Sequence, residues 1–353
     1  MDNPVYLKLF YKNFMAHQPN QCHVGLGVGA MHVGKVLRAQ GIKVDLHGIW
    51  KLADIHKVMS ESKTPVTHAI VEAPFLTAQE FLTLMRAYPD TIFICRYHSQ
   101  VGFLQVDPGA VRLIREYMYL QEQNFNFRLS VNSHRLGHFM QQAYHSHVLL
   151  LPNLYPTDRV NRKPWRPPGP LVRIGSFGAL RIQKNHTTAA AAAMIVAKSH
   201  GWDLEFHVNS NRDQHTGILG VLRDMFKGVP NARLVEVDWK QWAEFRHYIR
   251  VLDLHIQLSA TETFNLTSAD ATAEGVPIIV GEAIDWAPKI SHAHIDDAYA
   301  VASKAHMLLH DPHAAERGLR ALERYVANSI VIWKDYLSGR EHTMPNHLDP
   351  ADL

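Results

Sequence analysis

The sequence is 353 residues long, with 46% hydrophobic residues, 20% charged residues and a formal net charge of +3. This length exceeds what one hydrophobic core usually carries, so two domains are expected, and the composition argues against a globally disordered chain. The small net charge excludes a strong overall field for nucleic acid, although a local basic patch remains compatible with it.

Signals for cellular location are few. The N-terminus carries Asp2 and no long apolar core, and the longest apolar run, Ala189–Ala197, is too short to span a bilayer. Two cysteines, Cys22 and Cys95, form no disulfide framework and fit a reducing compartment. These features predict a cytoplasmic protein without a transmembrane segment.

The first half of the chain alternates strand-like and helix-like segments. The expected strands are Val5–Phe10, Val44–Ile49, His68–Glu72, Thr91–Tyr97, Leu129–Asn132 and Val148–Leu151. The expected helices are Met31–Gln40, Ala78–Ala87 and Ala110–Gln121. Strands that alternate with helices predict an α/β domain with a parallel, doubly wound sheet.

Residues 159–170, RVNRKPWRPPGP, contain four prolines and four basic residues, a composition that continues neither a helix nor a central strand. We therefore expect a hinge between an N-terminal domain, 1–158, and a C-terminal domain, 171–338, followed by a tail, 339–353. The two sheets are expected to face each other across a crevice, where such folds bind ligands.

The second half repeats the alternation. The expected strands are Leu171–Phe177, Leu204–Val208, Arg233–Val237, Leu252–Leu258 and Val276–Val280. The expected helices are Lys184–Lys198, Gly217–Phe226 and Gln241–Arg250, and the chain is expected to be mostly helical from Tyr299 to Tyr336.

Polar residues gather where strand Leu252–Leu258 ends. Thr267 or Ser268 can cap a helix that begins there, and the N-terminus of a helix favours a phosphate. Glu262 and Asp270 flank this position, and carboxylates accept hydrogen bonds from hydroxyls. A phosphate site flanked by hydroxyl-binding groups describes a nucleotide sugar. The alternatives are that Asp270 completes a capping box and that Glu262 is a solvated loop acid.

The segment ETFNLTSADATAEGVPII resembles E-G-F-G-L-P-x-x-E-A-x-A-x-G-x-P-V-V, a motif of nucleotide-sugar glycosyltransferases with two Rossmann-like domains, the GT-B fold. The resemblance is closest to the retaining glycosyltransferase family 4. The matching residues are Glu262, Phe264, Leu266, Asp270, Gly275 and Pro277. The resemblance implies that Glu262 contacts the donor sugar, that Asp270 holds the ribose, and that the backbone between them receives the diphosphate. Asn265 and Thr267 replace a Gly and a Pro of the motif.

Three further segments resemble the same family. SFGALRIQKNH places Lys184 at the phosphate-binding lysine, while Ala179 replaces the usual arginine, whose part Arg181 could take. VGLGVGAMHVGK places Gly27 and Gly29 in a glycine-rich loop that is expected to lie against the acceptor, and LPNLYPTD resembles the approach to the interdomain linker. TIFICRYHS places His98 after a strand, against the acceptor. The alternatives are that the glycines only permit a tight turn and that His98 is an ordinary edge histidine.

These features together predict a glycosyltransferase whose donor substrate is a nucleotide-diphosphate sugar, with no separate cofactor. No D-x-D triplet occurs, so no metal ion is indicated at the diphosphate. The alternatives are a nucleotide-sugar epimerase of the same fold and a non-catalytic nucleotide-sugar-binding protein. The acceptor could be nucleic acid bound through the hinge, unless the hinge charges serve solubility alone. The hinge cations are Arg159, Arg162, Lys163 and Arg166.

Overall fold

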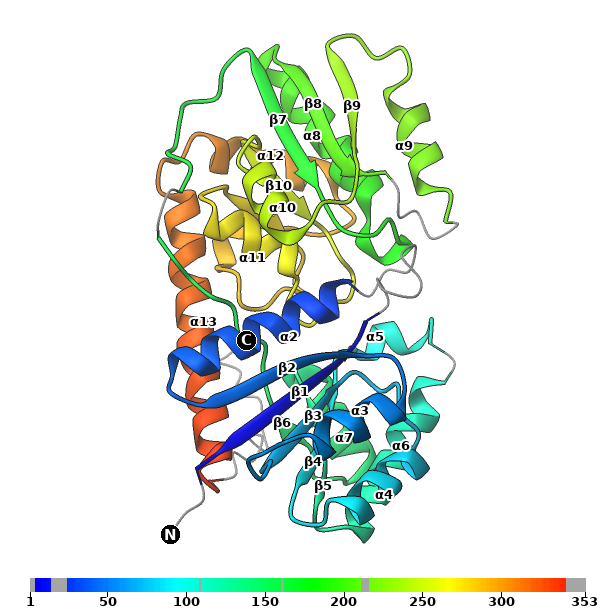
Figure 1. The fold of residues 1–353 in the computed structure, drawn as a ribbon. Helices are drawn as coiled ribbons and strands as arrows, with labels where there is room; N and C mark the ends of the chain where they lie inside the picture. Colours follow the sequence, from blue (N-terminus) through cyan, green and yellow to red (C-terminus); the bar gives the residue numbers. More distant parts are fainter. Residues whose placement is uncertain (1–3, 14–23, 108, 160–161, 211–215, 341–353) are drawn as a thin grey trace. The chain divides into compact units, whose positions relative to one another are not determined.

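The computed structural model describes residues 4–13, 24–107, 109–159, 162–210 and 216–340 (Figure 1). They form two compact units, one within Met1–Pro156 and Val326–Leu353 and one within Thr157–Tyr325. Cys22 and nearly all of the expected tail lie outside the described residues, and Cys95 is a buried free thiol.

The first unit is built on a six-stranded parallel sheet in the order β2-β1-β3-β4-β5-β6. Its strands are β1 (Tyr6–Lys12), β2 (Lys43–Ile49), β3 (His68–Glu72), β4 (Ile92–Tyr97), β5 (Phe127–Val131) and β6 (Leu149–Leu150). Its helices are α2 (Val24–Ala39), α3 (Leu52–Ser60), α4 (Ala78–Ala87), α5 (Val101–Leu104), α6 (Ala110–Gln123) and α7 (His134–Tyr144).

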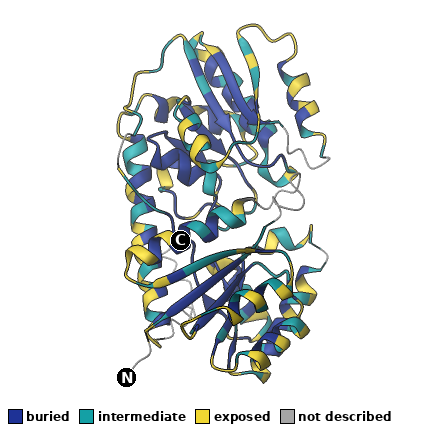
Figure 2. Ribbon diagram, in the orientation of Figure 1, coloured by how far each residue is buried: buried dark blue, intermediate teal, exposed yellow. Residues whose placement is uncertain are grey.

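The inner strands of the first unit's sheet, β3, β4 and β5, are buried, as their dark blue colour in Figure 2 shows, whereas the edge strand β2 is mostly half-buried or exposed. Strand β1 illustrates the reason: Leu7 and Leu9 join one apolar cluster, and Tyr6 and Phe10 join the other. Alternate residues of a strand point to opposite faces, so the apolar residues of β1 supply two cores, although Lys8 interrupts the apolar run.

The second unit contains a five-stranded parallel sheet in the order β11-β10-β7-β8-β9. Its strands are β7 (Leu171–Ser176), β8 (Asp203–Asn209), β9 (Ala232–Val237), β10 (Leu254–Gln257) and β11 (Ile278–Val280). Its helices are α8 (His186–His200), α9 (Ile218–Phe226), α10 (Trp242–Ile249), α11 (Leu266–Ala273) and α12 (Ala298–Leu309), and α13 (Ala314–Leu337) follows. The predicted α/β class with two parallel sheets is thus confirmed.

The C-terminal domain was expected to extend to residue 338, but the end of α13 does not belong to the second unit. Residues from Val326 onward group with the first unit, not with the second. Trp333 is fully buried in an apolar cluster with Leu7 and Leu9, and its indole N–H donates to the carbonyl oxygen of Pro152 at 2.9 Å. The apolar face of this last helical segment therefore completes the core of the first unit.

The expected elements also differ from the structure in the first unit. Helices α3, α5 and α7 were not among the expected helices, although α3 and α7 bury apolar residues such as Met59 and Met140. Helix α2 begins at Val24, so Gly27 and Gly29 lie in a helix and the expected glycine-rich loop at these positions is wrong. Within the described residues, no helix has the length and apolar character needed to cross a bilayer.

Candidate functional site

The strand order of the second unit reverses at β7. Strands β8 and β9 lie on one side of β7, and β10 and β11 lie on the other. The loops that follow β7 and β10 therefore leave the same edge of the sheet in different directions. Open parallel sheets bind ligands at such a switch point, beyond the carboxyl ends of the strands.

The loop after β7 is shaped around Lys184. Gly178 has a φ of +117°, a conformation that favours glycine, and its N–H donates to the Oδ1 of Asn209 at 2.9 Å. The chain then forms a short 3-10 turn, Ile182–Lys184, for which Arg181 is the N-cap residue. A methyl group on Gly178 would lie 3.9 Å from the Lys184 Nζ, so the loop backbone passes close to this cation.

The structure brings Lys184 and Glu262 together as an ion pair. Their side chains are only 17% and 15% exposed, and the Nδ2 of Asn265 also donates to the Glu262 carboxylate, at 3.1 Å. The N–H of Ala260 donates to the carbonyl oxygen of Gln183 at 2.8 Å, which ties the two loops to each other. The Glu262 carboxylate is therefore fixed by Lys184 and Asn265, and Glu262 is not a solvated loop acid.

Helix α11 begins one residue after Asn265, which is its N-cap. The Asn265 Oδ1 accepts hydrogen bonds from the N–H of Ser268 at 2.9 Å and from the hydroxyl of Thr267 at 3.0 Å. The expectation that Thr267 or Ser268 caps the helix is wrong. Asn265 has a φ of +64°, which asparagine tolerates better than most residues, and this explains how it replaces the motif's glycine. Leu266 and Thr267 form the first positions of the helix.

Asp270 lies deeper in α11 than the sequence suggested. It is the fifth residue after the cap, too far along the helix to complete a capping box, so that alternative is wrong. Its side chain is 2% exposed, and its Oδ1 accepts a hydrogen bond from the indole N–H of Trp242 in α10, at 2.9 Å. Trp242 was not anticipated as a site residue. The sequence offers no sign of a role for Trp242 in the site beyond the presence of an aromatic residue at the start of a helix.

Helix α10 also holds the other end of α11. Arg246 forms an ion pair with Glu274, and the Nε of Arg250 donates to the same carboxylate at 2.5 Å. Glu274 is 1% exposed, so this buried charge is balanced by two cations. The position of Asp270 is therefore fixed by a helix that is anchored at both ends.

Two buried histidines lie near the Lys184 loop. His186, at the start of α8, and His255, in β10, each have a pKa lowered to about 3, first by burial and then by the positive charge of Lys184. Both are therefore neutral near pH 7, so Lys184 is not joined there by a histidine cation. Among the described residues, no group of histidines, cysteines or acids is arranged to hold a metal ion.

In the first unit, His98 lies at the carboxyl end of β4 within a polar cluster. Its Nε2 is 2.5 Å from the Glu72 Oε2, and its Nδ1 is 3.1 Å from the Asn132 Nδ2. Burial would raise the pKa of Glu72, but the charge of Arg96 and the contact with His98 outweigh it and lower the pKa to about 2. His98 is thus not an ordinary edge histidine.

The two glycines of α2, Gly27 and Gly29, differ in their surroundings. A methyl group on Gly27 would lie 3.0 Å from the Cε2 of Tyr11, so the glycine permits close packing of α2 on the end of β1. A methyl group on Gly29 would meet nothing within 4 Å. Close packing therefore explains Gly27, and nothing in the described part of the chain explains Gly29.

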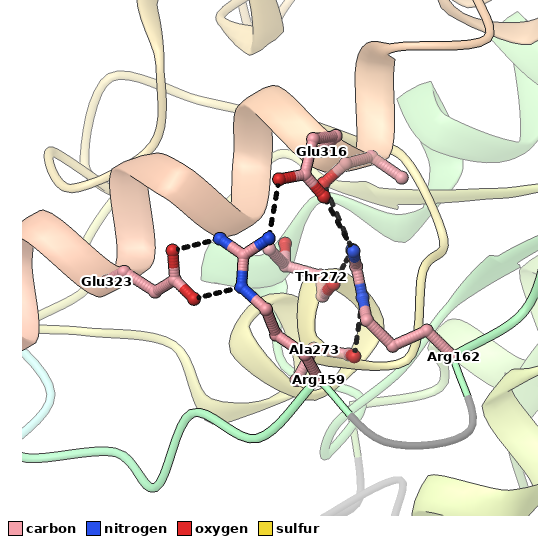
Figure 3. A network of polar contacts seen from close by, with 7 residues as sticks. Arg159, Arg162, Thr272, Ala273, Glu316 and Glu323 are labelled. Atoms are coloured by element: carbon pink, nitrogen blue, oxygen red, sulfur yellow. Dashed lines mark hydrogen bonds and ion pairs between the residues drawn. The ribbon is translucent and has the colours of Figure 1, made fainter.

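The hinge cations are engaged within the second unit (Figure 3). Arg159 forms ion pairs with Glu316 and Glu323, and Arg162 pairs with Glu316 at 2.8 Å while donating to the carbonyl oxygens of Thr272 and Ala273. These two carbonyls belong to the C-terminal end of α11, where a cation is favoured by the helix dipole.

The next hinge residue, Lys163, is held in the same way. Its Nζ pairs with Asp253 at 2.9 Å, and its backbone N–H donates to the Glu274 carbonyl oxygen at 2.8 Å. Gly275, with a φ of +87°, is needed here because a methyl group on it would lie 2.6 Å from the Lys163 carbonyl oxygen. Arg166 is exposed. Three of the four hinge cations thus serve internal contacts.

Comparison with known proteins gives matches at the level of structure. No protein-family model matches the sequence, and no curated protein matches it. Sucrose-phosphate synthase from Thermosynechococcus elongatus is similar over 94% of this chain and 98% of its own, with a TM-score of 0.63 and 15% identity. The chain has the GT-B fold.

Two further structures agree with this assignment. A glycosyltransferase from Rickettsia africae matches over 95% of this chain and 98% of its own, with a TM-score of 0.59 and 12% identity. HepE from Anabaena, solved with UDP and glucose, matches over 95% of this chain and 99% of its own, with a TM-score of 0.57 and 10% identity. Each match covers nearly the whole of this chain and nearly the whole of the similar protein.

Proposed function

We propose that this protein is a glycosyltransferase that transfers a sugar from a nucleotide-diphosphate sugar with retention of configuration. The observation that carries the proposal is the ion pair between Lys184 and Glu262 at the β7–β10 switch point, beside the N-terminus of α11. A cation, a carboxylate and a helix N-terminus meet there, which suits a ligand that combines phosphate with hydroxyl groups.

Each group has a distinct part in this proposal. Lys184, with Arg181 from the same loop and the backbone of Asn265, Leu266 and Thr267, stabilises the negative charge that develops on the diphosphate as the glycosidic bond breaks. Glu262 accepts hydrogen bonds from the donor sugar, and Asp270, held by Trp242, accepts them from the ribose. These last two assignments follow the resemblance of the segment to the family motif.

Two similar structures agree with a nucleotide-sugar donor. HepE was solved with UDP and glucose, and a TarM structure from S. aureus contains UDP. TarM matches over 81% of this chain and 57% of its own, with a TM-score of 0.59 and 12% identity. We assign the donor to the second unit, within residues 171–325, and the acceptor to the first unit through His98.

A mass-spectrometric screen tests the function. The protein is incubated with a panel of nucleotide-diphosphate sugars, first alone and then with lipid, glycan, small-molecule and duplex DNA acceptors. Release of the nucleoside diphosphate with mass gain on an acceptor supports transfer. A sugar isomerised without acceptor supports an epimerase instead, and donor binding without any turnover supports a binding protein.

A nucleic-acid acceptor has its own test, since three of the hinge cations are engaged internally. Binding to duplex DNA is measured across a salt series for the parent and for a variant with all four hinge charges neutralised. If DNA binds through the hinge, the plot of log binding constant against log salt concentration should be less steep for the variant. Its slope should be smaller in magnitude by roughly one unit for each phosphate that the variant no longer binds. Equal slopes direct the acceptor search to lipids, glycans and small molecules.

A further inference from the structure

The side chain of His98 is held from both sides at the carboxyl edge of the first sheet. Glu72 ends β3, His98 follows β4, and Asn132 follows β5, so three adjacent parallel strands each contribute one member. The contacts are 2.5 Å from the His98 Nε2 to Glu72 and 3.1 Å from the His98 Nδ1 to the Asn132 Nδ2.

The Glu72 carboxylate is fixed in place by Arg96. Both side chains have no solvent exposure, and the Arg96 Nη1 donates to the Glu72 Oε2 at 2.8 Å. The guanidinium is held in turn by the carbonyl oxygen of Leu151 at 2.8 Å and by the Asn153 Oδ1 at 2.7 Å. Glu72 is therefore a rigid, ionised acceptor below the imidazole.

This arrangement determines which ring nitrogen of His98 carries the proton. An ionised carboxylate only accepts hydrogen bonds, so the Nε2 at 2.5 Å must be protonated. The Arg96 Nη1 lies 3.4 Å from the same nitrogen, which is too far to compete with that contact. In the neutral ring the Nδ1 then holds the lone pair, and it faces the amide N–H₂ of Asn132.

We propose that Glu72 is a positioning residue that holds His98 in the Nε2–H tautomer, so that its Nδ1 accepts a hydrogen bond from a hydroxyl of the acceptor substrate. In the present structure the Asn132 amide occupies this lone pair, and the hydroxyl takes over the contact when the acceptor binds. The His98 side chain is 13% exposed, so the ring is not sealed from ligands. The proposal rests on the proposed function.

The charges that face His98 predict that two variants shift the pKa of His98 in opposite directions. Burial lowers the pKa of His98 below its usual value, Arg96 lowers it further, and Glu72 on the neighbouring strand raises it, while Asn132 on the other side is neutral. Glu72→Gln removes the anion and therefore lowers the pKa of His98. Asn132→Asp adds an anion at the Nδ1 and raises it, since a carboxylate favours the imidazolium.

Two measurements test the proposal. The first is an NMR pH titration of the ring nitrogens of ¹⁵N-histidine-labelled protein, with the His98 signals identified by their disappearance in His98→Gln. The second is the pH dependence of kcat/KM for transfer. The acid limb, where His98 is protonated and its Nδ1 lone pair is no longer available, is expected to move by about one pH unit or more. It moves to lower pH in Glu72→Gln and to higher pH in Asn132→Asp.

The magnitude and the control follow from the same contacts. Above the acid limb, Glu72→Gln is expected to lower kcat/KM by about tenfold or more, because a charge-assisted contact that orients the ring becomes a neutral one. Glu205→Gln is the matched control, since Glu205 is 7% exposed and contacts Arg173 and His207 on the second sheet. It leaves the acid limb and the His98 signals unchanged.

The outcomes separate this inference from the proposed function. Glu72→Gln leaves Arg96 without its carboxylate and can fail to fold, so Asn132→Asp, which keeps that pair, then decides. Unchanged His98 titration and an unmoved acid limb in the variants that fold overturn the proposal. If the parent turns over no donor, the glycosyltransferase function is rejected, while a parent spectrum without the Nε2–H tautomer overturns the role of Glu72 independently.

Discussion

Replacing Lys184 by alanine is the sharpest test of the candidate donor site. The substitution removes the cation proposed for the diphosphate, and a charge-assisted hydrogen bond to phosphate contributes about 1.5–3 kcal/mol. Because 1.36 kcal/mol corresponds to a factor of ten, kcat/KM is expected to fall by about 10- to 150-fold. The protein should still fold, although Glu262 then loses its ion-pair partner.

The expected decrease in stability can be worked from the same pair. Glu262 would keep the Asn265 Nδ2 at 3.1 Å, and its side chain is already 15% exposed, so water can replace part of the interaction with Lys184. We expect Lys184→Ala to lower the free energy of unfolding by about 1–3 kcal/mol, below the effect of breaking a fully buried pair. The folded fraction therefore stays high enough for kinetics.

The assay compares kcat/KM for donor consumption with the thermal midpoint in the same preparations. Lys198→Ala is the matched control, because Lys198 is an exposed lysine in the last turn of the helix that follows Lys184. It should change kcat/KM by less than about twofold, since an exposed surface charge contributes little. A Lys184→Ala protein that is destabilised but turns over donor like the parent would falsify the phosphate role and leave Lys184 as a partner of Glu262 only.

Two further predictions concern the motif helix and the hinge. Glu262→Gln is expected to reduce transfer more than binding of the nucleoside diphosphate, and Asp270→Asn to weaken that binding more than it changes kcat, as calorimetry and kinetics on both variants can check. If both variants keep parental activity and lose only thermal stability, neither carboxylate contacts the donor. Arg162→Ala should lower the free energy of unfolding by about 1–3 kcal/mol, because it removes contacts to Glu316 and to the end of α11, whereas Arg166→Ala at an exposed site should change it by less than about 0.5 kcal/mol. Equal denaturant midpoints for these two variants would contradict the structural role of the hinge cations.

The parts of the fold that the sequence predicted are those set by local pattern. Short apolar runs rich in branched residues, such as His68–Glu72 and Leu171–Ser176, form strands in the structure close to their expected bounds. The end of the apolar run Leu252–Leu258 likewise located the polar segment that follows β10. Local signals suffice there because strands that are buried on both faces of a parallel sheet are mostly apolar.

The parts that the sequence did not predict depend on contacts between distant residues. Trp242 meets Asp270 across 28 positions, and Arg96 meets Asn153 across 57. Neither Trp242 nor Arg96 carries a local signal that is specific to a site, because a tryptophan or a buried arginine is consistent with many environments until the sheet order is known. The prediction of the N-cap of α11 was also wrong. Thr267 and Ser268 are residue types that favour N-caps, but Asn265 adopts a positive φ and caps the helix, which therefore begins at Leu266.

The pairing of Lys184 with Glu262 has a consequence for how a donor is selected. A ligand with phosphate alone would draw Lys184 away and break the ion pair of a carboxylate that is only 15% exposed, a cost that offsets part of the phosphate contact. A ligand with both phosphate and sugar hydroxyls supplies a new partner to each member of the pair. If the proposed function holds, the complete nucleotide sugar is therefore favoured over the free nucleoside diphosphate, which would be the product that leaves. The same reasoning explains why Glu262→Gln should spare binding of the nucleoside diphosphate: without the carboxylate, Lys184 is available to phosphate, and no ion pair is broken when phosphate binds.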